Sequence, residues 1–443
     1  MHPLSFRAHN TQYYLTIQPQ LSFFQIKCIL YKRIILKRSA LRKATMKSFI
    51  TIQELLSLSL AIFCMLFGAG NLIYPLALGQ QAGAFTTFGI MGFFITALLL
   101  PLTGLVAMIL FNGDYQTFFG RIGKIPGHII TACCMLIIGP VVVIPRCITL
   151  SHTMIAPFLP LAFLKTITCA SSTFFCIVFL MFTFLAAYKK NKIVSVLGNI
   201  IAPILLAAIS FIIIKGLFIA DSVVPTTTTP FTIFTTGFMM GYQTLDLLGT
   251  LFFASIIISI IKKMAPGEDR LTILALYGLR AGVIGLSLLG CVYIGMSALG
   301  AFHTHEYMHA NPGELFTLIS YKILGPSVAA LVSISVLLAC TSTAIGLSAV
   351  VAEYCRVTLF RETITYVQSL VLLLLSCIPL SVFGLQYVLQ IAGGPIVYVG
   401  YPILIATTFC NIAYKLWGFR YIKIPVMITG IFATISYVAS VII

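Results

Sequence analysis

Two clusters of helix-breaking residues interrupt long apolar segments of this 443-residue sequence. The first runs from Phe67 to Pro75 and contains two glycines, Asn71 and a proline. The second runs from Gly237 to Gly249 and ends its central GYQTLD stretch with a carboxylate at Asp246. Glycine and proline disfavour a continuous helix, so we expect both segments to break. A half-helix restarting after Asn71 would offer N–H groups to a carboxylate, and freed carbonyls would suit an ammonium group or Na⁺.

Two charged residues lie inside the apolar segments. Asp246 belongs to the second cluster, and Arg146 follows Ile144 and Pro145. An ionisable residue at membrane depth is functional by default unless it is paired for structure. As a functional group, Asp246 would attract an ammonium group or a cation, or take up a proton; as a structural group, it would pair with Arg146 or cap the break. Arg146 has the same two interpretations, and we favour the structural one.

A third group of residues has the spacing of a cation site. In the eighth apolar segment, the Ala339 carbonyl and the Ser342 and Thr343 hydroxyls lie at positions i, i+3 and i+4 of one helix face. The first segment, near Cys64 and Phe67, would supply the second helix that completes a shell of oxygen ligands around Na⁺. Small hydroxyl residues are also common at packed interfaces between membrane helices, so the spacing alone leaves both interpretations open.

A competing motif is the sequence from His305 to His309, which reads HEYMH. It matches HExxH, in which two histidines bind Zn²⁺ and the glutamate is a general base, so the alternative function is a membrane zinc metalloprotease. The motif lies in a polar loop predicted from His303 to Lys322, and Asn311-Pro312-Gly313 leaves little helix to fix the ligands. His303 is a further potential ligand nearby and Glu314 could be proposed as another, but a convincing third ligand is missing. We interpret the motif as a solvated loop and expect no catalytic residue and no bound metal.

The composition excludes a water-soluble fold. Hydrophobic residues make up 60% of the sequence and charged residues 8%, against about 45–50% and about 25% in soluble chains. The apolar runs are long and continuous, which predicts transmembrane helices rather than barrel strands. About eleven spans are expected, at 52–79, 82–111, 125–150, 167–188, 193–220, 231–262, 269–301, 323–355, 364–383, 385–411 and 421–443.

Basic residues predict the orientation of these spans. Residues 1–47 form a basic arm, for which Met46 is an alternative translation start, and many later basic residues, such as Lys189 and Lys262, fall on the same side of the membrane. The positive-inside rule therefore places the N-terminus in the cytoplasm. The formal net charge is +17. We expect the basic residues of the arm to contact anionic membrane lipid, and we expect no nucleic-acid partner. The twelve cysteines contain no CxxC pair and predict no disulfide or metal framework.

Breaks in the first and sixth spans fit a fold of two five-helix halves with inverted topology, in which discontinuous helices meet at mid-membrane. We therefore divide the chain into the arm (1–47), a first repeat (48–220), a second repeat (231–411) and an additional helix (412–443). The sequence has no P-loop, which argues against the usual ATP-driven pump and favours an ion gradient as the energy source. An open channel is less consistent with paired breaks than alternating access is.

The motifs resemble those of the bacterial branched-chain amino acid carriers, the BrnQ-type family of cation symporters. The similarity runs in order through most of the chain and includes residues 67–75 with 79–83, 138–146, 198–203, 237–249, 339–353 and 390–402. It implies an all-α integral membrane protein with a LeuT-like, five-plus-five inverted-repeat core and discontinuous helices 1 and 6. It also implies import of Leu, Ile and Val across the bacterial inner membrane with a coupling cation, Na⁺ or H⁺ and usually Na⁺, and no other cofactor.

The resemblance and the spacing arguments together give two sets of site residues. The substrate would contact Gly68, Ala69, Gly70, Asn71, Gly241, Tyr242, Thr244 and Asp246. The cation would be held by Cys64, Phe67, Ala339, Ser342 and Thr343.

Overall fold

The structure is a computed structural model that describes residues 50–189, 197–220, 222–264, 270–304, 307 and 312–442. The helices below all belong to the unit Ile52–Ile443. The described residues form helices of α, 3₁₀ and π type joined by short connections, with no β-strand among them. The all-α architecture expected from the sequence is therefore confirmed.

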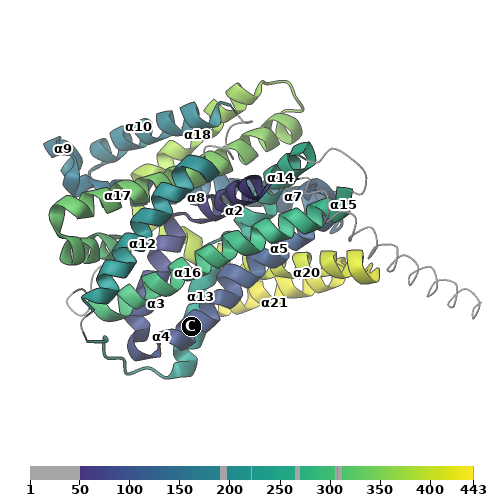
Figure 1. Ribbon diagram of the computed structural model, residues 1–443. Coiled ribbons are helices and arrows are strands. Elements are labelled where there is room, and N and C mark those ends of the chain that lie inside the picture. Colours follow the sequence, from purple (N-terminus) through teal and green to yellow (C-terminus); the bar gives the residue numbers. More distant parts are fainter. Residues whose placement is uncertain are drawn as a thin grey trace, which may run out of the picture. The chain divides into compact units, whose positions relative to one another are not determined.

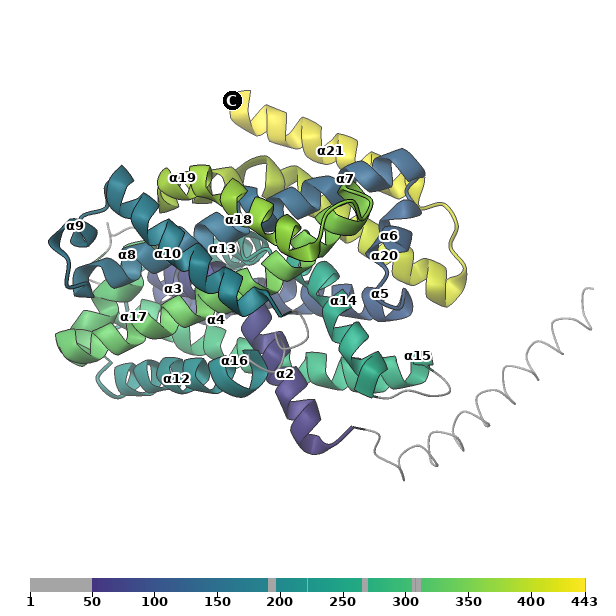
Figure 2. The ribbon, with the colours of Figure 1, turned by 90° about the horizontal axis from the view of Figure 1, so that it is seen from above.

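The elements of the first half follow the predicted spans closely (Figures 1 and 2). They are α2 (Ile52–Leu66), α3 (Ala69–Ala82), η1 (Gly83–Phe85), α4 (Thr86–Phe94), η2 (Ile95–Leu99), α5 (Leu100–Leu110), α6 (Tyr115–Gly120), α7 (Lys124–Leu136), η3 (Ile137–Val141), α8 (Val143–Ile155), η4 (Ala156–Phe158), α9 (Ala162–Lys165), α10 (Cys169–Ala187), η6 (Leu197–Ile201) and α12 (Ala202–Phe218).

The second half continues in the same manner, and α21 packs on α20 at one edge of the helices (Figures 1 and 2). Its elements are α13 (Pro230–Gln243), α14 (Asp246–Met264), α15 (Arg270–Ile273), η7 (Leu274–Gly278), α16 (Leu279–His303), α17 (Pro312–Tyr354), η9 (Cys355–Leu359), α18 (Tyr366–Val382), α19 (Leu385–Ile391), η10 (Ala392–Gly400), α20 (Tyr401–Trp417) and α21 (Lys423–Ile442).

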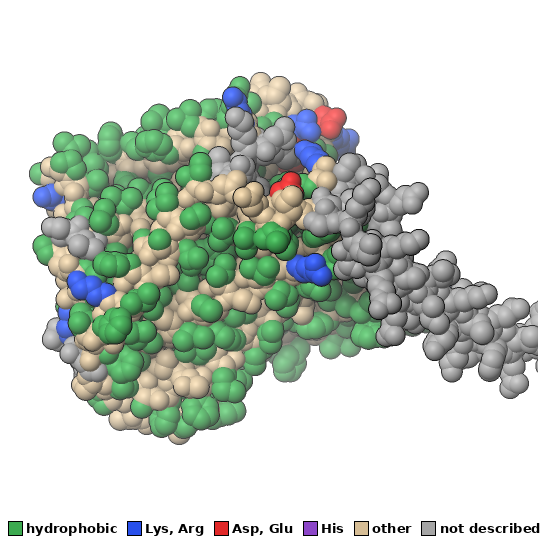
Figure 3. Space-filling view, viewed as in Figure 1, with side chains coloured by type: hydrophobic (Ala, Val, Ile, Leu, Met, Phe, Trp, Pro, Cys, Tyr) green, Lys and Arg blue, Asp and Glu red, His purple; other side chains and the backbone are tan. Residues whose placement is uncertain are grey.

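Apolar side chains face outward over most of these helices. Among the described residues, nine helical stretches are long and apolar enough to cross a membrane, and two further apolar helices, α2 and α18, are shorter. Large hydrophobic side chains such as Phe218, Phe231 and Phe432 are at least 74% exposed. On the face drawn in Figure 3, a wide apolar area separates the Lys and Arg side chains near its two ends. Only lipid makes such a surface favourable, so the chain is a multi-pass membrane protein.

The first predicted break is confirmed, with a small change of position. Helix α2 ends at Leu66, α3 begins at Ala69, and Gly68 between them is extended (φ −116°, ψ −162°). We expected the helix to restart after Asn71, but Asn71 already lies in the first turn of α3. The Asn71 Oδ1 atom accepts a hydrogen bond from the Gly68 N–H at 3.1 Å, which explains why the helix restarts earlier.

The second predicted break is also confirmed. Helix α13 ends at Gln243 and α14 begins at Asp246, which leaves Thr244 and Leu245 between the two helices. Leu245 adopts the left-handed conformation, with φ of +64°. This conformation costs a non-glycine residue about 1 kcal/mol or more, so the surrounding packing must hold it in place.

Three other helices contain interruptions that the sequence analysis did not predict. Non-helical backbone occurs at Gly139 in η3, Gly325 in α17 and Gly394 in η10, and each of these glycines precedes a proline. Proline removes a backbone donor and clashes with the preceding turn, so the Gly-Pro pairs account for the kinks.

The prediction of a continuous loop from His303 to Lys322 is wrong. Helix α16 continues to His303, and α17 begins at Pro312 and contains Lys322. Proline is well suited to the first turn of a helix because the N–H that it lacks would have no helical partner there. His305, Glu306, Met308 and His309 lie outside the described residues.

Helix α3 is held in the interior by close helix packing. It contacts α13, α16 and α17, and Figure 1 shows it beside α13 and α16. A Cβ atom on Gly79 would lie only 1.9 Å from the Ser297 carbonyl oxygen of α16. A glycine is therefore required at this crossing, and the close backbone contact fixes α3 against α16.

Candidate functional site

The two helix breaks meet in the protein interior. The Asn71 side chain, in the first turn of α3, donates a hydrogen bond from Nδ2 to Asp246 Oδ2 at 2.7 Å, at the start of α14. Both side chains are buried. Two segments about 175 residues apart in the sequence therefore form one site.

Asp246 is the centre of a buried hydrogen-bond network. Its Oδ2 atom also accepts a hydrogen bond at 3.0 Å from the hydroxyl of Tyr293, in α16, and that hydroxyl contacts Asn71 Nδ2 as well. The Tyr293 ring packs edge-on against Phe93, with 5.0 Å between ring centroids. The network ties together α3, α14 and α16, and its hydrogen bonds offset part of the cost of burying a carboxylate.

Arg146 caps the second break. The side chain is buried in α8, where Nη1 donates to the Gln243 carbonyl at 2.8 Å and Nη2 donates to the Thr244 carbonyl at 3.1 Å. These carbonyls lie at the end of α13, where helical partners are missing and the helix dipole is negative. Arg146 therefore has the structural role of a cap on the break. The hydrogen-bond partners of Asp246 are instead Asn71 and Tyr293.

A cavity of about 20 Å³ lies between the breaks, and we call it the central cavity. Five of the eight predicted substrate residues line it: Gly68, Ala69, Asn71, Thr244 and Asp246. Gly70 lies instead against Arg146. A cavity of this size holds about one water molecule, so an amino acid requires the helices around it to move apart.

Two predicted substrate residues point away from the central cavity. A Cβ atom on Gly241 would meet the Thr96 hydroxyl at 1.9 Å, so this glycine permits close packing of α13 against η2. The Tyr242 ring packs against Phe238 and Tyr401. Both residues pack α13 against its neighbours, and neither lines the central cavity.

The rest of the central cavity wall is largely apolar. Four of its apolar side chains lie away from the breaks themselves. They are Ile138 of η3, Val143 of α8, Phe253 of α14 and Leu347 of α17. Such a wall suits an aliphatic side chain. These four residues and Tyr293 were not identifiable from the sequence, because an apolar or aromatic residue in a membrane helix carries no sign of the partner that it faces.

The predicted cation residues form one cluster where α17 crosses the end of α2. The Ser342 hydroxyl donates to the Ala339 carbonyl at 2.7 Å and lies 3.1 Å from the Cys64 carbonyl. The Thr343 hydroxyl lies 3.3 Å from the Phe67 carbonyl, and Thr343 also lines the central cavity. All five residues are buried, and the cluster offers three carbonyl and two hydroxyl oxygens. These are the hard oxygen ligands that suit a small cation such as Na⁺.

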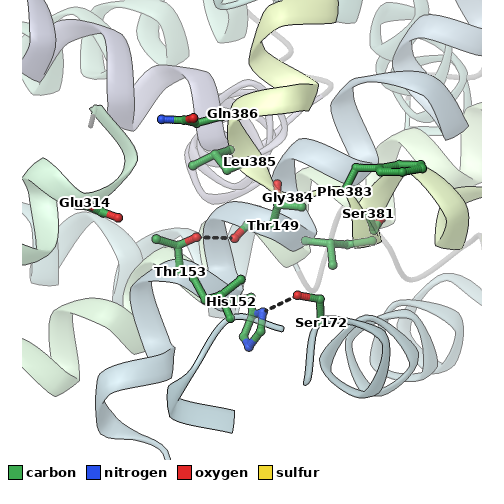
Figure 4. A pocket seen from close by; sticks show the side chains of 12 residues that line it. Thr149, His152, Thr153, Ser172, Glu314, Ser381, Phe383, Gly384, Leu385 and Gln386 are labelled. Atoms are coloured by element: carbon green, nitrogen blue, oxygen red, sulfur yellow. Dashed lines mark hydrogen bonds between the residues drawn. The ribbon is translucent and has the colours of Figure 1, made fainter. Parts of the chain in front are cut away.

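A second cavity, of about 260 Å³, lies between α8, α10, α17 and the turn from α18 to α19, and Figure 4 shows the residues around it. His152 lies on its wall with Nδ1 at 3.5 Å from the Ser172 hydroxyl, and His152 Nε2 is buried without a partner. Thr153 donates to the Thr149 carbonyl at 3.0 Å. None of the predicted substrate or cation residues lines this cavity, whereas Glu314, a candidate zinc ligand in the sequence, does.

Two larger cavities flank the end of α14, and both reach Ile260 and Met264. One, of about 460 Å³, lies between α14, α17 and Tyr115 of α6. The other, of about 720 Å³, lies between α14, the start of α2 and the segment that leads into α12. Both are far larger than the central cavity.

The described residues contain no group of three or more His, Cys, Asp or Glu side chains that would hold a metal ion. Of the HExxH motif, only Tyr307 is described, and its carbonyl accepts a hydrogen bond from Gln80 Nε2 at 2.9 Å. The proposed zinc ligands themselves lie outside the described residues.

The fold and the paired helix breaks define a structural class, the LeuT-like fold of membrane transporters. Two solved structures share this fold. The nucleobase-cation-symport-1 family transporter Mhp1, in a closed conformation, is 16% identical with a TM-score of 0.54, over 87% of this chain and 92% of Mhp1. The manganese transporter of Eremococcus coleocola is 15% identical with a TM-score of 0.56, over 88% of this chain and 86% of that one.

The chain belongs to the family described as branched-chain amino acid transport protein, whose sequence model matches residues 51–443. The branched-chain amino acid permease BraB of Bacillus subtilis is 28% identical, over 85% of this chain and 83% of BraB. The permease BrnQ of Escherichia coli K12 is 27% identical, over 87% of this chain and 86% of BrnQ. The resemblance noted in the sequence is thus confirmed, and these relatives are permeases, so the chain is a transporter and not an enzyme.

Proposed function

We propose that this protein imports the branched-chain amino acids Leu, Ile and Val together with a cation, by alternating access. The observation that carries the proposal is the central cavity, because the start of α3, the end of α13 and an apolar wall all border it. Each of these features matches one part of an aliphatic amino acid. The names of the permease relatives support the same substrates.

The main chain around the cavity can bind both charges of a zwitterion. The first turn of α3 carries N–H groups at the positive end of a helix dipole, which attracts a carboxylate. The Gln243 and Thr244 carbonyls lie at the negative end of α13 and suit an ammonium group. Ile138, Val143 and Phe253 would contact the aliphatic side chain.

We propose that the coupling ion is Na⁺ and that it binds the oxygen cluster of Cys64, Phe67, Ala339, Ser342 and Thr343. The cluster contains neither a carboxylate nor an imidazole, so it has no group suited to accept a proton near neutral pH. This favours Na⁺ over H⁺ at this position. Because Thr343 touches both the cluster and the central cavity, cation binding would stabilise the wall that the substrate contacts.

Transport requires the central cavity to open to each side in turn. At about 20 Å³ it is closed to an amino acid, whereas cavities of about 460 and 720 Å³ lie near the start of α2. We propose that this is the cytoplasmic side of a bacterial inner membrane, in agreement with the basic N-terminal arm. In this orientation, parting of α2 and α14 would release the substrate inward.

The experiment is uptake of radiolabelled Leu, Ile and Val into proteoliposomes that contain the purified protein. Inward Na⁺ and pH gradients are imposed separately, with labelled Met and Phe as comparison substrates and protein-free liposomes as the control. We expect accumulation of the branched-chain amino acids when the Na⁺ gradient is present and none when K⁺ replaces Na⁺. Failure to accumulate any of the three under either gradient would refute the function, and accumulation driven by the pH gradient alone would refute Na⁺ coupling.

A further inference from the structure

Arg146 is an unusual residue for a capping role. Its side chain is only 2% exposed, and its guanidinium donates hydrogen bonds to two neutral main-chain carbonyls and interacts with the neutral Tyr74 side chain. The Nε atom is buried and has no hydrogen-bond partner. A buried cation with an unpaired donor costs free energy, and a carboxylate is the partner that a guanidinium binds most strongly.

The position of the guanidinium relative to α3 indicates where such a carboxylate would lie. A Cβ atom built on Gly70 would be 2.8 Å from Arg146 Nη2, so the guanidinium rests directly against the first turn of α3. Arg146, Gly68 and Ala69 border or line the same cavity. The positive end of α3 and a permanent positive charge therefore meet at one place, and both attract an anion.

Asp246 does not supply that anion. It lines the same cavity, but its Oδ2 atom accepts hydrogen bonds from Asn71 and Tyr293, and it forms no ion pair with Arg146 within 4.0 Å in the described structure. Among the described residues, no carboxylate therefore pairs with the guanidinium.

We propose that Arg146 is the residue that binds the substrate carboxylate, and that substrate binding is an exchange of partners. The guanidinium leaves the Gln243 and Thr244 carbonyls and pairs with the carboxylate beside the start of α3. The substrate ammonium then takes the place of the guanidinium on the two carbonyls. This inference rests on the proposed function and extends it by naming the side chain that binds the substrate carboxylate.

The exchange explains why both ends of the amino acid are needed. Before and after binding, a positive charge occupies the negative end of α13, so the carbonyls are never left without a donor. An amine without a carboxylate would displace Arg146 and leave a buried cation unpaired. A carboxylate without an ammonium group would draw Arg146 away and leave the carbonyls uncapped. Either ligand should bind far more weakly than the zwitterion.

The test compares the binding of L-leucine and L-leucinamide to purified protein, because leucinamide keeps the ammonium group and the side chain but has no negative charge. We expect the wild-type protein to favour leucine by about ten- to hundredfold, from the usual strength of charged hydrogen bonds. In Arg146→Gln this ratio should fall to the few-fold preference that the helix dipole at the start of α3 provides by itself. In Arg146→Lys it should be intermediate, because lysine keeps the charge without the planar fork. Arg280→Gln, at an exposed position of α16, is the matched control and should keep the wild-type ratio.

The outcomes separate this inference from the proposed function. A folded Arg146→Gln protein that binds leucine and still discriminates as the wild type does would overturn the role of Arg146, with the transport assignment unaffected. If Arg146→Gln does not fold, as judged by size-exclusion chromatography, Arg146→Lys decides the question, and an unchanged ratio in that variant overturns the proposal. Wild-type protein that binds none of Leu, Ile and Val would instead contradict the proposed function.

Discussion

Replacing Tyr293 with phenylalanine removes one hydroxyl from the network that joins the two helix breaks. The ring should keep its edge-on contact with Phe93, at 5.0 Å between centroids, so no sizeable cavity forms. The variant loses the hydrogen bond from the Tyr293 hydroxyl to Asp246 Oδ2, at 3.0 Å, and the contact of that hydroxyl with Asn71 Nδ2. A buried carboxylate would then retain Asn71 but lack one of its donors.

The magnitude follows from the usual value of a hydrogen bond to a charged group, about 1.5–3 kcal/mol. The network shapes the cavity wall, so we expect the loss to appear in two readouts, a lower thermal midpoint of the purified protein and weaker leucine binding. If the full free energy acts on the binding-competent state, the affinity falls by about ten- to hundredfold. Equilibrium binding of labelled leucine and thermal unfolding in detergent measure the two effects.

The control is Tyr387→Phe, since Tyr387 lies in α19 with 45% of its surface exposed and its ring packs on Phe383. This variant loses the same hydroxyl far from the breaks and should behave as the wild type. If Tyr293→Phe has the same leucine affinity and the same thermal midpoint as Tyr387→Phe and the unmodified protein, the Tyr293 hydroxyl does not stabilise the network.

Two further predictions concern packing and coupling. Gly79→Ala should prevent correct folding, because its Cβ would lie 1.9 Å from the Ser297 carbonyl oxygen, whereas the control Gly120→Ala, whose Cβ would have no atom within 4 Å, should be tolerated. Expression levels and size-exclusion profiles would show the difference, and a well-folded Gly79→Ala protein would contradict the α3–α16 packing. Ser342→Ala and Thr343→Val each remove one hydroxyl oxygen from the proposed cation cluster, so the Na⁺ concentration for half-maximal leucine uptake should rise several-fold in each; unchanged Na⁺ dependence in both would place the ion elsewhere.

The breaks were predictable because they depend on local residue types. Glycine, proline and an amide or carboxylate within a few positions weaken any helix, whatever surrounds it. The first residue of the restarted helix was not predictable from propensity alone. It depends on the particular hydrogen bond from the Gly68 N–H to the Asn71 side chain, which brings Asn71 inside α3.

The cation cluster was predictable for a related reason. The spacing of Ala339, Ser342 and Thr343 fixes them to one helix face, and only one partner segment had to be chosen. The structure brings Cys64 and Phe67 to that face. Whether a cation binds there stays a prediction, as do the boundaries of the two repeats.

The orientation of α13 could not be read from the sequence. Gly241 and Tyr242 lie within the predicted break region, but they face η2 and aromatic neighbours rather than the central cavity. The partners of Arg146 and Asp246 also depend on how α8 and α16 pack against the breaks. Such pairings are set by tertiary structure, and a single sequence does not encode them in any local pattern.

The proposed transport requires an amino acid to bind between the two helix breaks. A cryo-electron microscopy map of the protein in lipid nanodiscs, saturated with leucine and Na⁺, tests it directly. We predict ligand density between the start of α3 and the end of α13, with its two ends within hydrogen-bonding distance of the Gly68–Asn71 backbone and of the Gln243 and Thr244 carbonyls. Leucine density at another place, with both breaks closed around Arg146 as in this structure, would contradict the account.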